Sequence, residues 1–143
     1  MIVLDTTVLV YAVGDEHALR EPSRRLIEAI GEGRLRAATT PEVVQEFVHV
    51  RARRRARRDA VRLGRAYADL LEPLLVVDGG DLEQGLRLFE RHAELGAFDA
   101  VLAAVAVGRR AEALVSADVS FGSVPGLRHV ELGTSALDDL VPG

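Results

Sequence analysis

Apolar residues along this chain fall into short unbroken runs and into longer stretches with helical spacing. The short runs predict four buried strands, at residues 2–4, 35–38, 74–77 and 113–116, and a fifth is expected at 130–132. Helical spacing predicts helices at residues 6–13, 16–30, 41–50, 59–71, 81–95, 98–107 and 135–140. Strands that alternate with helices are typical of an α/β fold. We therefore expect three layers, with a mostly parallel four- to five-stranded sheet between helices, formed as one domain over residues 1–143.

Local signals set several helix ends. Thr40 is a typical N-cap residue, and Pro41 suits the first helical position that follows it. Pro22 is expected to interrupt or restart its helix near the beginning. No glycine or proline separates the helices predicted at 41–50 and 59–71, so only Asp59, as an N-cap, favours a turn near residues 55–58.

Positive charge is concentrated in one segment. The whole chain has a net charge of −4, yet residues 51–65 hold eight arginines and a single acid. One continuous helix would place six of these arginines within an arc of about 100°, whereas a turn would gather them at the tip of a helical hairpin. Either arrangement favours contact with nucleic-acid phosphates, through Arg51, Arg54, Arg55 and Arg58. The alternatives are a solvated surface or pairing with the chain's own acids.

Four acids are expected at one edge of the sheet. Asp5 directly follows the first strand, and Asp118 lies two residues beyond the strand at 113–116. Glu46 lies on the helix after the second strand, and Asp99 lies in the first turn of its helix among apolar neighbours. Because sites in parallel α/β sheets form at the carboxyl ends of strands, these carboxylates are candidates for one cluster.

Each acid also has a structural explanation when it is considered alone. Asp5 would cap a helix, Asp99 would suit the helix dipole, Glu46 would lie on a solvated helix edge, and Asp118 would be a turn residue. Four separate structural explanations would all have to apply at the same end of the sheet, whereas a single shared site accounts for all four acids. Converging carboxylates repel one another unless a cation neutralises them, and oxygen ligands without His or Cys suit Mg²⁺ or Mn²⁺.

The motifs around these acids resemble those of the PIN domain family and, within it, the VapC-type toxins of bacterial toxin–antitoxin pairs. The four motifs are Leu4-Asp5-Thr6-Thr7-Val8-Leu9-Val10, Val44-Gln45-Glu46-Phe47, Phe98-Asp99-Ala100-Val101-Leu102-Ala103-Ala104 and Leu114-Val115-Ser116-Ala117-Asp118-Val119-Ser120-Phe121. Thr7 stands where the family more often has Ser or Asn. The resemblance extends from Asp5 to about Leu132.

The resemblance implies a PIN fold and Mg²⁺-dependent endoribonuclease activity. It implies that Asp5, Glu46, Asp99 and Asp118 are the catalytic, metal-binding acids. Thr7 and Ser116 would orient these acids or a metal-bound water by hydrogen bonding. Homodimerisation and inhibition by a cognate VapB-type antitoxin are further expectations, and the substrate would be RNA.

Two other functions match parts of the sequence. A phosphatase of the haloacid dehalogenase type would use Asp5 as its nucleophile, but it needs a second Asp at the position of Thr7 and usually a lysine, and the chain has no lysine. A PIN-like module that binds RNA without turnover is the non-enzymatic alternative. A nuclease with another role, such as RNA processing or DNA flap cleavage, is a further one.

Some chemistry and some locations are disfavoured. Without cysteine the chain has no disulfides, zinc–thiolate sites or cysteine nucleophile. The N-terminal residues carry no basic leader, and the apolar run at 97–108 is too short to span a bilayer. We therefore expect a cytoplasmic protein that does not enter the membrane.

Overall fold

A parallel sheet forms the middle layer of the structure, a computed structural model that describes residues 1–141. Its four strands are β1 (Ile2–Leu4), β2 (Ala37–Ala38), β3 (Leu114–Ser116) and β4 (His129–Glu131), in the order β2-β1-β3-β4. All three neighbouring pairs are parallel, with Val3 opposite both Ala38 and Leu114. The predicted fold class is confirmed, and the strand expected at residues 130–132 is present as β4.

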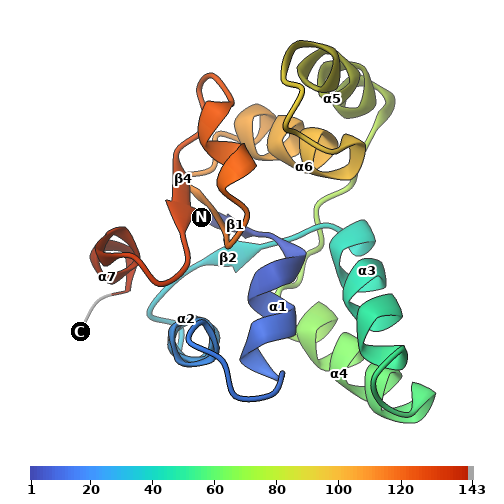
Figure 1. Cartoon of the computed structure of the whole chain (residues 1–143), viewed down its shortest axis with the longest axis vertical. Helices are drawn as coiled ribbons and strands as arrows, with labels where there is room; N and C mark the ends of the chain where they lie inside the picture. Colours follow the sequence, from blue (N-terminus) through green and yellow to red (C-terminus); the bar gives the residue numbers. More distant parts are fainter. Residues whose placement is uncertain (142–143) are drawn as a thin grey trace.

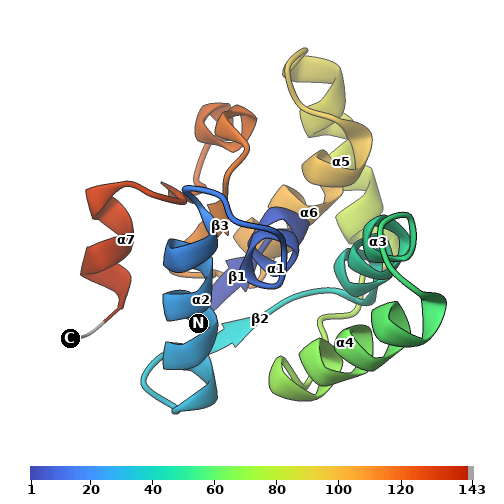
Figure 2. The same ribbon diagram turned by 60° about the horizontal axis from the view of Figure 1, so that its bottom comes forward.

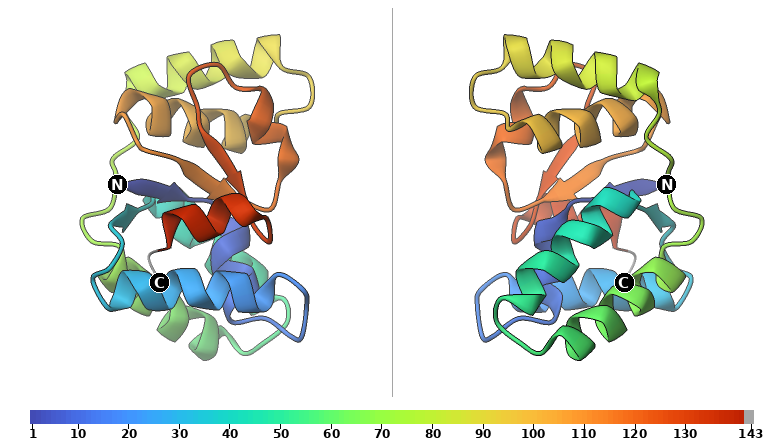
Figure 3. Two further views of the ribbon diagram at one scale, coloured as in Figure 1. Left: turned by 90° about the vertical axis from the view of Figure 1, so that its left-hand side faces the viewer. Right: turned by 90° about the vertical axis from the view of Figure 1, so that its right-hand side faces the viewer.

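Helices cover both faces of the sheet, as Figures 1 and 3 show. One face is covered by α5 (Gly79–Arg91) and α6 (Ala97–Gly108). The opposite layer contains α1 (Thr6–Ala12), α2 (Arg20–Gly31), α3 (Pro41–Ala52) and α4 (Arg57–Leu70). Figure 2 shows α3 and α4 side by side as a hairpin. The short helix η1 (Val119–Ser123) follows β3, and α7 (Ser135–Leu140) packs beside β4 at the sheet edge.

The strand predicted at residues 74–77 is wrong. This segment is extended but joins the sheet through one backbone hydrogen bond, from the Leu75 N–H to the Thr39 carbonyl at 2.9 Å. Leu74 and Leu75 pack against the core, whereas Val76 is 71% exposed. The apolar run therefore covers the core without forming a strand ladder.

All seven predicted helices are present, most of them with shifted ends, and the helix predicted at 81–95 ends at Arg91. The cap at Thr40 is present, since its side chain accepts a hydrogen bond from the Val43 N–H at 3.2 Å. The helix containing Pro22 begins at Arg20 instead of Glu16. The turn between α3 and α4 exists, but Ala56 is the N-cap and Asp59 lies in the first turn of α4. The apolar spacing that predicts α4 includes Val61, but this residue is 40% exposed instead of facing the core.

The α3–α4 hairpin is tied to the core by aromatic packing. Phe47 of α3 and Tyr67 of α4 meet edge to face, with ring centroids 4.9 Å apart. The Tyr67 hydroxyl donates to the Leu9 carbonyl of α1 at 2.9 Å. This packing fixes α3, and with it Glu46, relative to the start of α1.

The α5–α6 pair is held by a close backbone approach and an ion pair. A Cβ added to Gly85 would lie 2.7 Å from the Cα of Val101, so only glycine allows this contact. At the other end, Arg109 donates two hydrogen bonds to Asp81, at 2.8 and 2.9 Å, and a third to the Val76 carbonyl. Hydrogen bonding from Arg109 lowers the pKa of Asp81 to about 2. These contacts fix α6, which carries Asp99.

Three apolar side chains of α5 are about half exposed, whereas Leu88 packs against the core. Leu82, Leu86 and Phe89 are 49%, 48% and 47% exposed, while Asp81 and Gly85 face α6. We call these three residues the α5 stripe. Among the described residues, no helix is both long and apolar enough to cross a lipid bilayer.

Candidate active site

The structure places the four predicted acids at the carboxyl edge of the sheet. Asp5 follows β1, Asp118 follows β3, Glu46 lies in the second turn of α3 and Asp99 in the first turn of α6. Asp5, Glu46 and Asp99 line one cavity of about 280 Å³. Its remaining walls are largely apolar and come from α3, α5 and α6, with Phe98 82% exposed. Three of the four acids therefore share a cavity, and the fourth is linked to it through Asp99.

Asp5 is the most buried of the four acids, at 4% exposure. Its Oδ2 accepts hydrogen bonds from the Ser116 hydroxyl at 2.6 Å and from the Thr7 hydroxyl at 3.0 Å. Asp5 occupies the N-cap position of α1, but its side chain makes no capping hydrogen bond. Helix capping therefore does not account for this carboxylate.

The two hydroxyls that hold Asp5 are themselves fixed by the chain after β3. The Asp118 N–H donates to the Ser116 hydroxyl at 2.9 Å, and the Ala117 N–H donates to the Thr7 hydroxyl at 3.0 Å. These bonds join the ends of β1 and β3. Asp118 also caps η1, because its Oδ1 accepts a hydrogen bond from the Ser120 N–H at 2.9 Å. The turn role considered for Asp118 is thus real and coexists with its place beside the cavity.

Asp99 shows the effect of crowded carboxylates. Burial raises its pKa to about 7, and the charges of Asp5, Asp118 and Glu46 add to this effect. Burial also acts to raise the pKa of Asp118, but hydrogen bonds from Ser120 and from Asp99 outweigh it and lower that pKa. The pKa of Asp99 is thus raised while that of Asp118 is lowered, so Asp99 is the acid of this pair that keeps a proton closer to neutral pH.

Glu46 is exposed on α3, which agrees with the solvated helix edge considered for it as an alternative. Its side chain is nevertheless held, because the Thr6 hydroxyl donates to Oε2 at 2.8 Å. Thr6 was not among the predicted site residues. The sequence shows that Thr6 is next to Asp5. It does not show that the Thr6 hydroxyl donates to Glu46, because this contact depends on how α3 packs against α1.

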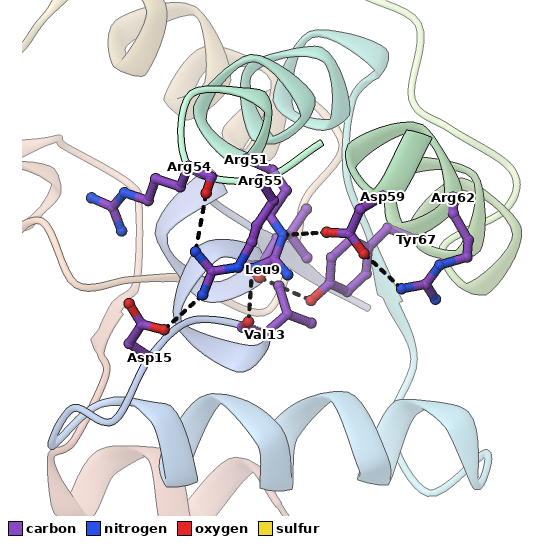
Figure 4. A network of polar contacts seen from close by, with 9 residues as sticks. All are labelled: Leu9, Val13, Asp15, Arg51, Arg54, Arg55, Asp59, Arg62 and Tyr67. Atoms are coloured by element: carbon purple, nitrogen blue, oxygen red, sulfur yellow. Dashed lines mark hydrogen bonds and ion pairs between the residues drawn. The ribbon is translucent and has the colours of Figure 1, made fainter. Parts of the chain in front are cut away.

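The predicted RNA-binding arginines lie at the tip of the α3–α4 hairpin (Figure 4). The continuous helix is not formed, so the hairpin alternative is the one observed. Arg51 is 16% exposed and donates to Asp59 at 2.8 Å and to the Val13 carbonyl at 3.0 Å. Hydrogen bonds from Arg51 and then Arg62 lower the pKa of Asp59.

The other arginines of the tip differ in their engagement. Arg55 donates to Asp15 at 2.9 Å, whereas the Arg54 guanidinium points away from this network in Figure 4. Arg58 is exposed at the start of α4. Pairing with the chain's own acids, one of the alternatives considered for the run, therefore applies to Arg51 and Arg55.

We expect the stability of the metal-free protein to fall as the pH rises from about 4 through 7. In this window the folded chain binds more protons than the unfolded chain, because the pKa of Asp99 is raised by folding. The stabilisation from Asp99 is fully present below the pKa that Asp99 has in the unfolded chain. It is lost as the pH rises through the pKa of Asp99 in the folded protein. Thermal unfolding in EDTA across this range, compared with Asp99→Asn, measures it. Equal pH profiles for the wild type and the variant would contradict the assignment.

Comparison with known proteins connects this geometry to a family. The PIN domain family model matches residues 2–127. Ribonuclease VapC7 of Mycobacterium tuberculosis is 52% identical over 138 residues, which cover 91% of this chain and 90% of that protein. A VapC ribonuclease of Mycobacterium bovis is 30% identical over 131 residues, covering 91% of this chain and 99% of that protein.

Two crystal structures share the fold. One is VapBC2 from Rickettsia felis bound to a DNA fragment from its promoter, with a TM-score of 0.72, 18% identity, and coverage of 92% of this chain and 99% of that chain. The other is Mycobacterium tuberculosis VapC20, a sarcin–ricin loop cleaving toxin, with a TM-score of 0.72, 20% identity, and coverage of 90% and 99%. The resemblance inferred from the four motifs is confirmed: the chain belongs to the PIN domain family and, within it, to the VapC ribonucleases.

Proposed function

We propose that this chain is a metal-dependent endoribonuclease that acts as the toxin of a VapBC-type pair in the cytoplasm, with residues 1–143 serving as one nuclease domain. The proposal rests on the cavity shared by Asp5, Glu46 and Asp99, in a chain 52% identical to Ribonuclease VapC7. Carboxylates that crowd together at a cavity are costly unless a cation neutralises them. The raised pKa of Asp99 supports such a role.

The cation we propose is Mg²⁺, with Mn²⁺ as a replacement, held by Asp5, Glu46, Asp99 and Asp118. An all-oxygen donor set fits a hard cation of this kind. Within residues 1–141, no three acidic or histidine side chains lie close enough as they stand to hold one ion. We propose that binding includes rotation of the carboxylates and loss of the proton that Asp99 holds near neutral pH.

A bound divalent ion supplies an activated water and neutralises charge on the phosphodiester that is cleaved. The chain's residues supply position and proton control. The hydroxyls of Thr7 and Ser116 keep Asp5 in one orientation. The carboxyl of Asp99 holds a proton near neutral pH and releases it when a positive charge arrives beside it.

Cleavage of RNA tests this proposal. We expect turnover with Mg²⁺ or Mn²⁺ and none in EDTA. We expect a loss of about 100-fold or more in Asp99→Asn, because the proposed cation loses an anionic ligand and the reacting phosphate then loses the stabilisation that the cation would supply. The measurement is the cleavage rate of structured RNA, with folding of the variant checked by thermal unfolding. Full activity in EDTA or in the variant would contradict the mechanism. Tight binding without turnover under either metal would favour the non-catalytic module, and a fluoroberyllate adduct on Asp5 would favour a phosphatase.

We propose that Arg54 and Arg58 bind the RNA backbone. Both are exposed, and neither guanidinium belongs to an ion pair found among the described residues. Contacts from Arg51 and Arg55 to RNA stay a prediction. Both make hydrogen bonds within the protein, and Arg51 in particular joins α3 to α1 and α4. An acidic segment of the antitoxin is the alternative ligand for this surface.

The two kinds of arginine should respond differently to substitution. The double variant Arg54→Ala, Arg58→Ala should weaken RNA binding. The slope of the logarithm of the binding constant against the logarithm of the salt concentration should become shallower by about 0.7 for each arginine removed. Arg51→Ala should instead destabilise the fold by about 1–3 kcal/mol, because the Val13 carbonyl loses a charged donor. The measurements are RNA binding against salt and denaturant unfolding. Unchanged RNA binding in the double variant, with weaker antitoxin binding, would assign the surface to the antitoxin.

Two protein partners complete the proposal. A VapB-type antitoxin is proposed because the structural neighbour from Rickettsia felis is a VapBC complex. A second copy of the chain is proposed to cover the α5 stripe, defined above by Leu82, Leu86 and Phe89. These side chains are about half exposed and lie along one helix face, and a two-fold axis would pair the stripe with itself. Leu82 and Leu86 also line the cavity that holds Asp5, Glu46 and Asp99, so this interface would border the active site.

The dimer is tested by one charge in the α5 stripe. We expect the wild-type protein to have twice the 15.5 kDa mass of one chain, and Leu86→Arg to have the mass of a monomer. Light scattering coupled to size exclusion measures this. Val61→Arg is the matched control, because Val61 is 40% exposed on α4 and lies outside the stripe. A monomeric wild type, or dissociation by both substitutions, would contradict this interface.

A further inference from the structure

Thr6 connects two segments that each carry an acid of the site. It is the first residue of α1, directly after Asp5, and is 5% exposed. Its hydroxyl donates to Oε2 of Glu46 on α3 at 2.8 Å. The turn that positions Asp5 therefore also donates a hydrogen bond to Glu46.

Glu46 needs an external restraint to keep one orientation. Its backbone is fixed, because Val43 and Phe47 on either side of it are buried. The Glu46 side chain itself is exposed and has three rotatable bonds, so it loses conformational freedom when it is held at the cavity. A buried hydroxyl aimed at one of its oxygens supplies that restraint before any ligand binds.

We infer that Thr6 is a positioning residue for the metal centre, acting through its hydrogen bond to Glu46. This inference rests on the proposed function, because it assigns Glu46 to the cation. A hydroxyl is suited to the task, since it neither neutralises the carboxylate nor uses both of its oxygens. Oε1 stays available to a cation while Oε2 is held.

Thr6 and Thr7, at one strand-to-helix turn, each hold a different acid of the site. Thr7 donates to Asp5, the acid on its own turn, and Thr6 donates across to Glu46 on a different helix. Two successive hydroxyls therefore set the relative placement of two acids that are 41 positions apart in the sequence. Partners that hold ligands in this way typically alter metal affinity when they are removed.

The test measures Mn²⁺ affinity directly, by electron paramagnetic resonance of free Mn²⁺, so that activity is not the readout. Thr6→Val keeps the shape of the side chain and removes the hydroxyl, and we expect it to weaken Mn²⁺ binding about 10-fold. Thr6→Ser should restore most of the affinity. In a Glu46→Ala background, Thr6→Val should have no further effect, because its route to the metal is already lost.

Thr39→Val is the matched control. Thr39 is a buried threonine whose hydroxyl donates to the Leu4 carbonyl at 2.8 Å, so this substitution removes a comparable hydrogen bond that does not involve an acid. Both valine variants should unfold at lower temperature, but only Thr6→Val should lose affinity. Should Thr6→Val not fold, Thr6→Ala and Thr6→Ser provide the same comparison.

Three results would overturn the inference. These are wild-type affinity in Thr6→Val, an equal loss in Thr39→Val, and an undiminished effect of Thr6→Val in the Glu46→Ala background. A wild-type protein that binds no Mn²⁺ would instead refute the proposed function itself, and the inference with it.

Discussion

Repulsion between carboxylates at the carboxyl edge of the sheet is the constraint around which this structure is arranged. In this chain, uncharged hydroxyl groups donate hydrogen bonds to the carboxylates. Asp5 accepts hydrogen bonds from two hydroxyls, Glu46 accepts one, and the pKa of Asp99 is raised to about 7. An arginine would relieve the same repulsion, but it would also occupy the place that the proposed cation requires. Three arginines of the α3–α4 hairpin pair instead with Asp15 and Asp59, away from the cavity: Arg51, Arg55 and Arg62.

The alternation of strands and helices could be predicted because it depends on local patterns. Apolar runs marked β1 and β3, and Thr40 with Pro41 marked the start of α3. The run at 74–77 has the same composition as a strand, but it makes a single backbone hydrogen bond, to Thr39 beside the two-residue strand β2, and so does not extend the ladder. Likewise, the spacing of Leu82, Leu86 and Phe89 indicates a helix, but it does not say whether the core or a partner covers that face.

The acids could be predicted as a group because parallel strands bring their carboxyl ends to one edge. Their hydrogen-bond partners were accessible only in part. Thr7 and Ser116 lie within two positions of a predicted acid, whereas the bond from Thr6 to Glu46 depends on the angle at which α3 crosses α1. The arginine run shows the same limit, since Arg51 and Arg54 differ in burial although they are three residues apart.

The missing side chain at Gly85 has a consequence for how the surface of this protein can change. Because α5 and α6 touch through backbone at Val101 and are clamped by Arg109, they behave as one rigid support. The outer residues of α5 can vary in sequence without displacing the helix that carries Asp99. New protein contacts can therefore evolve on this face of the molecule while the carboxylate at its inner end keeps its place.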